Sequence, residues 1–371
     1  MISDSARFDA YAKAISRCVR PGHVVAEIGC GPGVFALLAC RAGAKRVYAI
    51  ETEDIIDVAR EIAGSNGFAD RIQFFQSDSR KTELPERVDV IVSDIRGILP
   101  LFNGALASQQ DAKTRFLAPG GLMIPRRDVM KAAIAEFEKF YSEIVAPWTT
   151  CVAGTELSTA RQLELNSAHG GRIRFEQLMS DPHELCTLDY LDDPRPNVSN
   201  KLSFRAKRGG SAHGICVWFE TELYEDIGFS SGPGSPVNIY GQLLLPFLEP
   251  LVMEEGQEIL VTLHANLVGK DYIWRWETEI AGRDGGKKVH FRQSTFEGTN
   301  ISSRTLRRHA VGYIPVLTAE GEAQRFLLGA MDGCASLEEI AKKAAERFPE
   351  VYSSHEDALQ HATELTRKFS R

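Results

Sequence analysis

The first third of the chain alternates short apolar runs with amphipathic segments, which is the pattern of parallel strands connected by helices. An amphipathic stretch at 4–20 is followed by predicted strands at 24–28, 46–50, 72–76 and 88–93, and then by a predicted helix at 109–117. A turn at 119–121 leads to one more strand, which opens at Leu122. This alternation predicts an α/β fold with a doubly wound parallel sheet.

Beyond residue 125 the apolar positions change to strand-like segments separated by turns rich in Gly and Pro. The predicted strands are 131–137, 215–223, 237–245, 258–265, 273–280 and 289–296, and the clearest turns are 230–236 and 282–286. This pattern predicts an antiparallel β-barrel or sandwich. Residues 140–193 have a mixed pattern, and we expect them to be partly helical.

The last sixty residues have a third pattern. One strand-like piece at 312–317 precedes helical segments at 320–331, 337–348 and 355–369. Ser336 and Glu339 form a capping box at the start of one of these helices. We therefore expect three parts: a Rossmann-like domain at 1–125, a β-barrel domain at 126–305, and a small α-rich module at 312–371.

The first strand runs into a loop rich in glycine. Its notable residues are Glu27, Gly29, Cys30, Gly31 and Gly33. Glycines at alternate positions let a backbone turn tightly and approach a ligand closely. The next strand ends in Glu51, where a carboxylate can accept hydrogen bonds from both hydroxyls of a ribose. The two features predict a nucleoside pocket, although Glu51 could instead cap a helix.

The spacing of this loop differs from that of a dinucleotide site, which has G-x-G-x-x-G and holds pyrophosphate at a helix N-terminus. Glu27 at the head of the loop would repel such an anion but not a sulfonium. The segment looks like motif I of the class I methyltransferases, so the predicted cofactor is S-adenosylmethionine. We expect Asp78 and Ser79, after the third strand, to meet the adenine edge, unless Asp78 is a simple turn residue.

Composition narrows the class of protein. The chain has 371 residues, 43% of them hydrophobic and 25% charged, with a net charge of −7. We expect no strong field that recruits nucleic acid or an anionic membrane. A transmembrane run and a signal peptide are both lacking, and the seven cysteines have no metal-binding spacing, so we expect a cytoplasmic enzyme with free thiols.

Several segments together resemble the protein arginine methyltransferases over residues 1–300. Asp4, Arg7 and Tyr11 match the helix before the fold. The other matching segments are 84–93, 116–125, 229–233 and 256–259 together with Gln242. The resemblance implies that Arg7 contacts the methionine carboxylate of the cofactor. It also implies a homodimer built through an arm near 145–190. The chain begins at Met1 without the helix that covers the cofactor in that family, so we expect a more open pocket or closure by another segment.

The chain departs from this family where the acceptor should lie. The family holds a guanidinium between two glutamates nine residues apart, and these positions are Asp94 and Asn103 here. Arg96 stands between them, and at ~4 Å it would repel a cationic substrate by ~4 kcal/mol if the effective dielectric constant is ~20. Ile239 replaces the family's histidine in the loop that ends at Tyr240, which leaves Asp4 without its expected partner.

We therefore expect methyl transfer to an atypical acceptor, a small molecule or peptide, by N- or O-methylation in specialised metabolism. The candidate catalytic residues are Asp94, Arg96, Asn103 and Tyr240. Asp94 is the best candidate for orienting or deprotonating the acceptor. Arg96 could instead point to solvent or pair with a surface acid, and Asp94 could then still hold a free arginine or another guanidino compound. The alternatives are therefore an arginine or guanidino N-methyltransferase and a catalytically silent cofactor-binding scaffold.

The tail has a resemblance of its own. Residues 320–340 are similar to the small winged-helix-like chaperones that bind peptides in pathways such as pyrroloquinoline quinone assembly. An edge strand of such a module could accept a peptide by strand addition. A helical cap on the barrel and a dimer contact are the alternatives.

Overall fold

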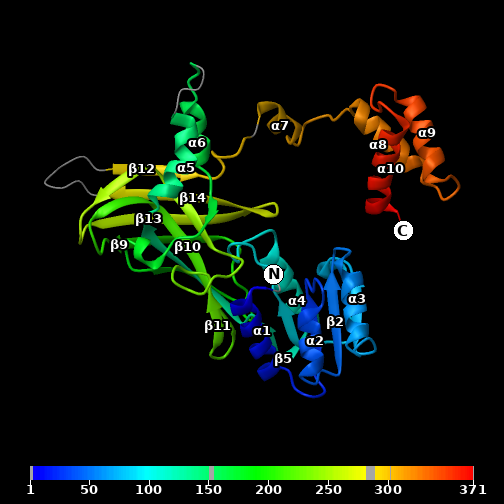
Figure 1. The fold of residues 1–371 in the computed structure, drawn as a ribbon, viewed down its shortest axis with the longest axis horizontal. Coiled ribbons are helices and arrows are strands. Elements are labelled where there is room, and N and C mark those ends of the chain that lie inside the picture. Colours follow the sequence, from blue (N-terminus) through cyan, green and yellow to red (C-terminus); the bar gives the residue numbers. More distant parts are fainter. Residues whose placement is uncertain (1–2, 150–153, 281–288, 301, 371) are drawn as a thin grey trace. The chain divides into compact units, whose positions relative to one another are not determined.

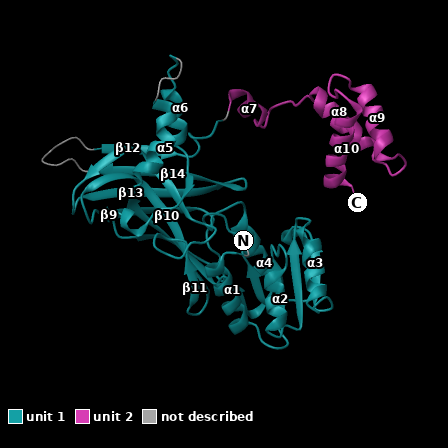
Figure 2. Ribbon diagram, in the orientation of Figure 1, with its two compact units in different colours: residues 1–300 teal, residues 301–371 magenta. Residues whose placement is uncertain are grey.

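The computed structural model describes residues 3–149, 154–280, 289–300 and 302–370. They form two compact units, Met1–Asn300 and Ile301–Arg371 (Figure 2). The predicted boundary at 125 therefore separates two parts of a single unit. Among the described helices, none has both the length and the apolar character needed to cross a bilayer.

The N-terminal part of the first unit is a five-stranded sheet in the order β3-β2-β1-β4-β5, and every pairing is parallel. Its strands are β1 (Val24–Ile28), β2 (Arg46–Glu51), β3 (Ile72–Gln76), β4 (Val88–Ser93) and β5 (Leu117–Ile124). Its helices are α1 (Ser5–Cys18), α2 (Val34–Arg41), α3 (Ile55–Ser65), η1 (Ser79–Lys81) and α4 (Ala105–Phe116). Figure 1 shows this part in blue and cyan. The strand order and the parallel pairings confirm the predicted parallel sheet.

Two boundaries in this part differ from the prediction. Helix α4 begins at Ala105 instead of 109, because Gly104 adopts a left-handed conformation and starts the helix there. Strand β5 begins at Leu117 and includes the predicted turn at 119–121, where Gly120 has a φ of 76° and the register against β4 shifts. Residues 119–121 thus form an irregular part of a strand and not a turn, because a glycine with positive φ occurs in β-bulges as well as in turns.

The C-terminal part of the first unit contains two antiparallel sheets. The larger has the order β7-β12-β10-β6-β8, with β11 paired to β10, and the smaller has the order β15-β14-β13-β9. The strands are β6 (Arg127–Ala135), β7 (His169–Gly171), β8 (His183–Asp189), β9 (Val198–Arg205), β10 (Gly210–Tyr224), β11 (Ile227–Ser230), β12 (Gln242–Met253), β13 (Glu258–Val268), β14 (Asp271–Ile280) and β15 (Val289–Ser294). The antiparallel architecture is confirmed. The ladders among the described strands stay within each sheet, so a closed barrel is not shown.

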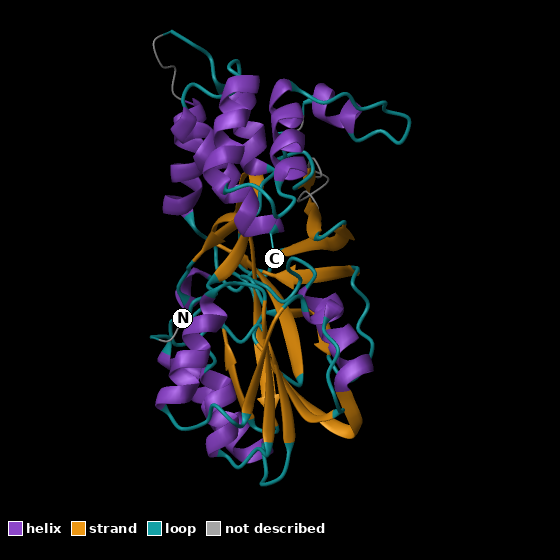
Figure 3. Cartoon of the chain, turned by 90° about the vertical axis from the view of Figure 1, so that its right-hand side faces the viewer, coloured by secondary structure: helices purple, strands orange, loops and turns teal. Residues whose placement is uncertain are grey.

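Apolar packing joins the two parts of this unit. One cluster extends from residues such as Ala26 and Ile91 on the parallel sheet to Phe204, Phe247 and Trp276 in the antiparallel sheets. A second cluster covers the opposite face of the parallel sheet and includes Val25, Val47 and Val90. Alternate residues of each strand therefore enter different cores, as the side-chain period of two requires. Figure 3 shows helices flanking the strands.

Three details of the antiparallel part correct or extend the sequence prediction. Strand β12 begins at Gln242, because residues 237–241 form a loop in which the Asn238 side chain donates to Ser230 O (2.8 Å). Strands β8 and β9 were not predicted, since alternating exposed polar residues dilute their apolar signal. The mixed stretch contains α5 (Glu138–Thr149), α6 (Ser158–Leu165) and η2 (Phe175–Gln177), as expected of a partly helical region. The predicted turn at 282–286 lies outside the described residues.

The second unit contains α7 (Ser303–Arg308), α8 (Ala319–Ala330), α9 (Leu337–Arg347) and α10 (His355–Phe369). The last three helices share their own apolar core, which includes Leu327, Ile340 and Leu365. The capping box is confirmed, since Glu339 N donates to Ser336 Oγ (3.3 Å) and Ser336 N donates to Glu339 Oε2 (2.9 Å).

The predicted strand at 312–317 is wrong. Residues 302–370 contain no strand, and Ile314 and Val316 are each 84% exposed. An apolar run becomes a strand only when a neighbouring strand satisfies its backbone groups, and the described part of this unit supplies none. The proposed edge for peptide addition is therefore not present there.

Asp4 has partners, contrary to the expectation from the lost histidine. Its carboxylate caps α1 by accepting from Arg7 N (3.2 Å) and also accepts from the backbone N–H of Ile239 (2.9 Å). Arg7 Nε lies 3.7 Å from the same carboxylate. A backbone donor of the 237–241 loop thus does what a side chain was expected to do, and it ties α1 to the antiparallel part.

The Asp4→Ala substitution should therefore lower the free energy of unfolding by about 2 kcal/mol, because it removes a helix cap and leaves the Ile239 N–H unpaired. Urea denaturation of the two proteins measures the difference. Asp9→Ala, an exposed position on the same helix, is the matched control and should change stability by less than about 0.5 kcal/mol. Equal losses in the two variants would contradict the assignment.

Candidate active site

A cavity of about 1190 Å³ opens at the carboxyl ends of the parallel strands. The loops that follow β1, β2, β3 and β4 line it, together with the start of α1 and Lys270 at the tip of the β13–β14 hairpin. Ligands of open α/β sheets bind at this edge, outside the carboxyl ends of the strands. The cavity is therefore the candidate site, and most of the residues singled out in the sequence lie in its wall.

The glycine-rich loop has the backbone that its composition predicts. Gly29, Gly31 and Gly33 have φ values of 71°, 50° and 75°, which L-residues with a side chain rarely adopt. A Cβ at Gly29 would lie 2.6 Å from Ile95 Cγ2, whereas a Cβ at Gly31 would meet no atom within 4 Å. Gly29 and Gly31 line the cavity, and Gly33 caps α2 and packs on Ala59.

Glu51 lies in the cavity wall at the end of β2. Its carboxylate accepts from Gly31 N (2.9 Å) and from Thr52 N (2.7 Å), so it holds the glycine-rich loop against the second strand. The alternative role as a helix cap is wrong, because Asp54 occupies the N-cap of α3. Both carboxylate oxygens of Glu51 thus accept backbone hydrogen bonds at the cavity wall, and its contact with a ribose stays a prediction.

Glu27 also lines the cavity, but its carboxyl group is buried. It accepts from Ala36 N in the first turn of α2 (2.7 Å), one of the amides that a helix leaves unpaired. Burial raises the pKa of Glu27 well above its usual value. The residue therefore has a structural role, and its electrostatic role toward a cofactor stays a prediction.

Asp78 and Ser79 lie in the wall after β3. Asp78 caps η1 and forms an ion pair with Arg80 (2.8 Å), whose hydrogen bonds lower the pKa of Asp78 to about 2. It is thus a turn residue and a lining residue at once. Cys30 lines the same cavity, and burial raises the pKa of its thiol. The six described cysteines are all free thiols, and Cys151 lies outside the described residues.

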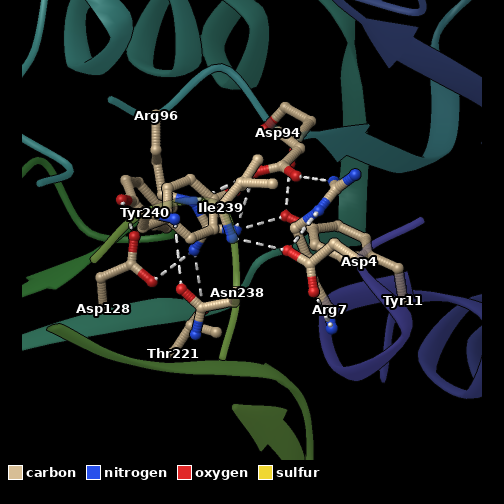
Figure 4. Close-up of polar contacts among 12 residues, drawn as sticks. Asp4, Arg7, Tyr11, Asp94, Arg96, Asp128, Thr221, Asn238, Ile239 and Tyr240 are labelled. Atoms are coloured by element: carbon tan, nitrogen blue, oxygen red, sulfur yellow. Dashed lines mark hydrogen bonds and ion pairs between the residues drawn. The ribbon is translucent and has the colours of Figure 1, made fainter. Parts of the chain in front are cut away.

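Arg7 and Asp94 form an ion pair at the end of the cavity nearest the antiparallel sheets (Figure 4). Both side chains are 5% exposed, and both residues line the cavity. Arg7 also lies over the ring of Phe35, with its guanidinium carbon 5.8 Å from the centroid. The arginine that the family resemblance assigns to the cofactor therefore lines the cavity and contacts the candidate catalytic acid, and its contact with the cofactor stays a prediction.

Arg96 does not point to solvent, and it does not line the cavity. Its side chain is fully buried and pairs with Asp94 (3.0 Å) and Asp128 (2.8 Å). We expected the charge of Arg96 to repel a cationic acceptor. This expectation is wrong, because the carboxylates of Asp94 and Asp128 compensate that charge.

The other two candidate catalytic residues lie in different settings. The Tyr240 hydroxyl donates to Asp94, and burial raises the pKa of this phenol well above its usual value. Asn103 is exposed in the cavity wall, in the turn before α4, with a φ of 37°. Arg96 and Tyr240 thus contact Asp94 but do not line the cavity themselves, whereas Asn103 lies in the cavity wall.

Sequence reasoning missed several residues of the site. Phe8 and Phe35 supply an apolar wall, and Lys270 reaches it from a distant hairpin. Asp128, Thr221 and Tyr190 bind Arg96 or its partner from behind. Of these residues, only Asp128 has a feature that the sequence shows, because it is a charged residue at the start of the apolar strand β6. The remaining residues become neighbours of the site only through tertiary contacts.

The raised pKa of Glu27 predicts a pH dependence. A group whose pKa is higher in the folded state stabilises the fold below its unfolded value of about 4.3, and this contribution disappears as the pH rises through the folded value. The wild type should therefore lose stability relative to Glu27→Gln as the pH rises, because glutamine keeps the bond to Ala36 N without a charge. Urea denaturation from about pH 5 to about pH 9 measures this. A constant difference between the two proteins would contradict it, and Glu83→Gln, at an 89% exposed side chain, is the matched control.

Two family models match overlapping parts of the chain. Residues 11–155 match the ribosomal protein L11 methyltransferase family, and residues 127–277 match the arginine methyltransferase oligomerization subdomain. The first match covers most of the residues that line the cavity, and the second covers most of the antiparallel strands.

Curated relatives are protein arginine methyltransferases. The chain is 30% identical over 244 residues to the probable protein arginine N-methyltransferase 6 of Arabidopsis thaliana, which covers 63% of this chain and 54% of that protein. It is 25% identical over 271 residues to protein arginine N-methyltransferase 1 of Dictyostelium discoideum, which covers 71% of this chain and 79% of that protein. The chain thus spans about half the length of the first relative.

Solved structures share the fold. The Trypanosoma brucei arginine methyltransferase 1 enzyme–prozyme heterotetramer with S-adenosylhomocysteine superposes with a TM-score of 0.74 at 23% identity, over 79% of this chain and 96% of that one. Arabidopsis thaliana protein arginine methyltransferase 10 gives 0.70 at 21% identity, over 79% and 95%. The family models, the relatives and the solved structures thus all make this chain similar to methyltransferases, and to the protein arginine methyltransferases in particular.

Proposed function

We propose that this protein is an S-adenosylmethionine-dependent methyltransferase that acts on a neutral or anionic acceptor, a small molecule or a peptide, by N- or O-methylation in specialised metabolism. One observation carries the proposal: both carboxylate oxygens of Asp94 already have donors. Tyr240 and Arg96 donate to Oδ1, and Arg7 donates to Oδ2. The other acids that line the cavity, among the described residues, are Glu27 on β1, Glu51 on β2 and Asp78 after β3.

A guanidinium acceptor needs carboxylate oxygens arranged to receive paired N–H groups. At Asp94 it would compete with two arginines and a tyrosine, and at the second family position it would meet the amide of Asn103. Lys270 adds a positive charge to the same cavity. The occupied carboxylate of Asp94 and the amide at Asn103 therefore disfavour a guanidinium acceptor, whereas the compensated charge of Arg96 does not.

The residues present fit the cofactor, and we assign its binding to the cavity wall. The proposed contacts are Arg7, Glu27, Gly29, Cys30, Gly31, Gly33, Glu51, Asp78 and Ser79, with Gly33 acting through the loop. S-Adenosylmethionine supplies an electrophilic methyl group when bound. The protein then has to align the acceptor and exclude water. In this scheme Asp94 Oδ2, whose one donor among the described contacts is Arg7, accepts a single hydrogen bond from the acceptor and orients it, while Tyr240 and Arg96 fix the position of the carboxylate and Asn103 contacts the acceptor.

Two alternatives have their own support. An arginine or guanidino N-methyltransferase is favoured by the names of the relatives and by Asp94 at a family position. That function requires Arg7 to release Asp94 Oδ2 so that a single carboxylate can receive the acceptor. A cofactor-binding scaffold without turnover is the third candidate. The tail's resemblance to peptide-binding chaperones supports a peptide acceptor, although the expected edge strand is lacking in residues 302–370.

The Asn103→Glu substitution tests the acceptor class. With radiolabelled S-adenosylmethionine, the wild type should methylate members of a panel of amide, amine, hydroxyl and carboxylate compounds, and arginine-rich peptides should be poor acceptors. Asn103→Glu restores a second carboxylate and should raise the rate with guanidino acceptors about tenfold, because a charge-assisted bond is worth about 1.5 to 3 kcal/mol.

The matched control is Asn103→Gln, which changes length without adding charge and should leave the preference unchanged. Efficient labelling of arginine peptides by the wild type would contradict the proposal and support the first alternative. Cofactor binding without turnover across the panel would support the scaffold.

We further infer a homodimer in which the arm near 145–190 docks on a second copy. Residues 127–277 match an oligomerization subdomain, and α5 and α6 belong to this region. Ile55 and Val58 are 40% and 43% exposed and lie one turn apart on α3, where they offer an apolar surface.

The Ile55→Asp/Val58→Asp double variant should therefore sediment as a monomer where the wild type sediments as a dimer. Ile314→Asp/Val316→Asp makes the same chemical change at an exposed site in the second unit and should remain dimeric. A wild-type monomer at micromolar concentration would overturn the inference.

A further inference from the structure

The guanidinium of Arg96 is bound as a ligand would be. Nη1 donates to Asp128 Oδ1 (2.8 Å) and to Thr221 Oγ1 (2.9 Å), and Nη2 donates to Tyr11 OH (2.5 Å). On its other side Nη2 and Nε donate to Asp94 Oδ1 (3.0 and 3.3 Å). Figure 4 shows these contacts converging from several chain segments.

Aromatic rings complete this enclosure. The Arg96 guanidinium carbon lies 5.1 to 5.9 Å from the ring centroids of Phe219, Phe229, Tyr240 and Tyr11. Cations within about 6 Å of a ring face are attracted by its quadrupole, and the attraction grows when water is excluded. We call the two aspartates, Thr221 and these four aromatic residues the Arg96 cage.

The Arg96 cage lies where the two parts of the first unit meet. Asp94 and Arg96 follow β4 of the parallel sheet, whereas Asp128 lies on β6 and Thr221 on β10 of the larger antiparallel sheet. Tyr190 donates to the second oxygen of Asp128 (2.6 Å), which fixes that carboxylate from behind. The guanidinium therefore connects the candidate catalytic acid to the antiparallel sheet.

We propose that Arg96 is a positioning residue for methyl transfer: its guanidinium fills an acid-lined aromatic cage and thereby fixes Asp94 and Tyr240 at the acceptor end of the cavity. The inference rests on the proposed role of Asp94 in orienting the acceptor. Without this guanidinium, two buried carboxylates would repel one another and Asp94 would lose two of its donors. A shift of about 1 Å in such a group can cost about 100-fold in rate.

The Arg96→Ala variant, tested by chemical rescue, decides the matter. The full-length variant should lose about 100-fold in kcat, with little change in the KM for S-adenosylmethionine. Guanidinium chloride at millimolar concentration should restore much of kcat and raise the melting temperature of the variant but not of the wild type. Urea, a neutral molecule of the same shape, should do neither, because the cage needs a cation.

The Arg96→Ala/Asp128→Asn double variant is the matched control and should not respond to guanidinium, since one of the two carboxylates of the cage is gone. The thermal measurement needs no methyl acceptor, so it tests the cage even if the proposed acceptor class fails. Equal responses to urea and guanidinium, or rescue of melting temperature without rescue of kcat, would overturn the positioning role.

Should Arg96→Ala fail to fold, Tyr190→Phe carries the test. It removes one hydrogen bond to Asp128 and touches neither Asp94 nor the cavity. The variant should lower kcat several-fold while leaving the affinity for S-adenosylhomocysteine unchanged. An unchanged kcat would contradict the proposal.

Discussion

The structure of the site depends on the pairing of Asp94 with two arginines. Arg7 comes from the first helix, Arg96 from the loop after β4, and both meet the same buried carboxylate. A buried charge is tolerated only when it is paired and its remaining hydrogen-bonding capacity is used. The network joins the guanidinium groups of Arg7 and Arg96 to three carboxylates, those of Asp4, Asp94 and Asp128, so that each buried charge lies beside an opposite one.

This pairing also connects the two roles proposed for the cavity. In the proposed scheme Arg7 and the glycine-rich loop contact the cofactor, and Asp94, which also lines the cavity, orients the acceptor. Asp94 connects Arg7 to Arg96, and Arg96 contacts the larger antiparallel sheet. The position of Asp94 therefore depends on contacts from both the parallel and the antiparallel part of the first unit. A methyltransferase needs such alignment, since the reaction is limited by the positioning of two reactants.

The resemblance to arginine methyltransferases and the departures from it have a common physical basis. A site for a guanidinium acceptor presents carboxylates to the cavity. Here two carboxylates and four aromatic rings surround a guanidinium that belongs to the chain itself. In the proposed scheme the amide at Asn103 and the paired carboxylate of Asp94 both make the site less suited to a guanidinium acceptor.

The sequence by itself determined the parallel fold, the glycine-rich loop, Glu51 and the helices of the tail, because each depends on local periodicity or on backbone freedom. Strands β1, β3 and β4 match the prediction to the residue for this reason. Only the tertiary structure decided the environment of Arg96 and the partner of Asp4. A charge in a loop is compatible with both solvent and burial, and a backbone N–H such as that of Ile239 leaves no sequence signal. The predicted strand at 312–317 was wrong for a related reason: apolar residues favour a strand, but a strand forms only beside another one.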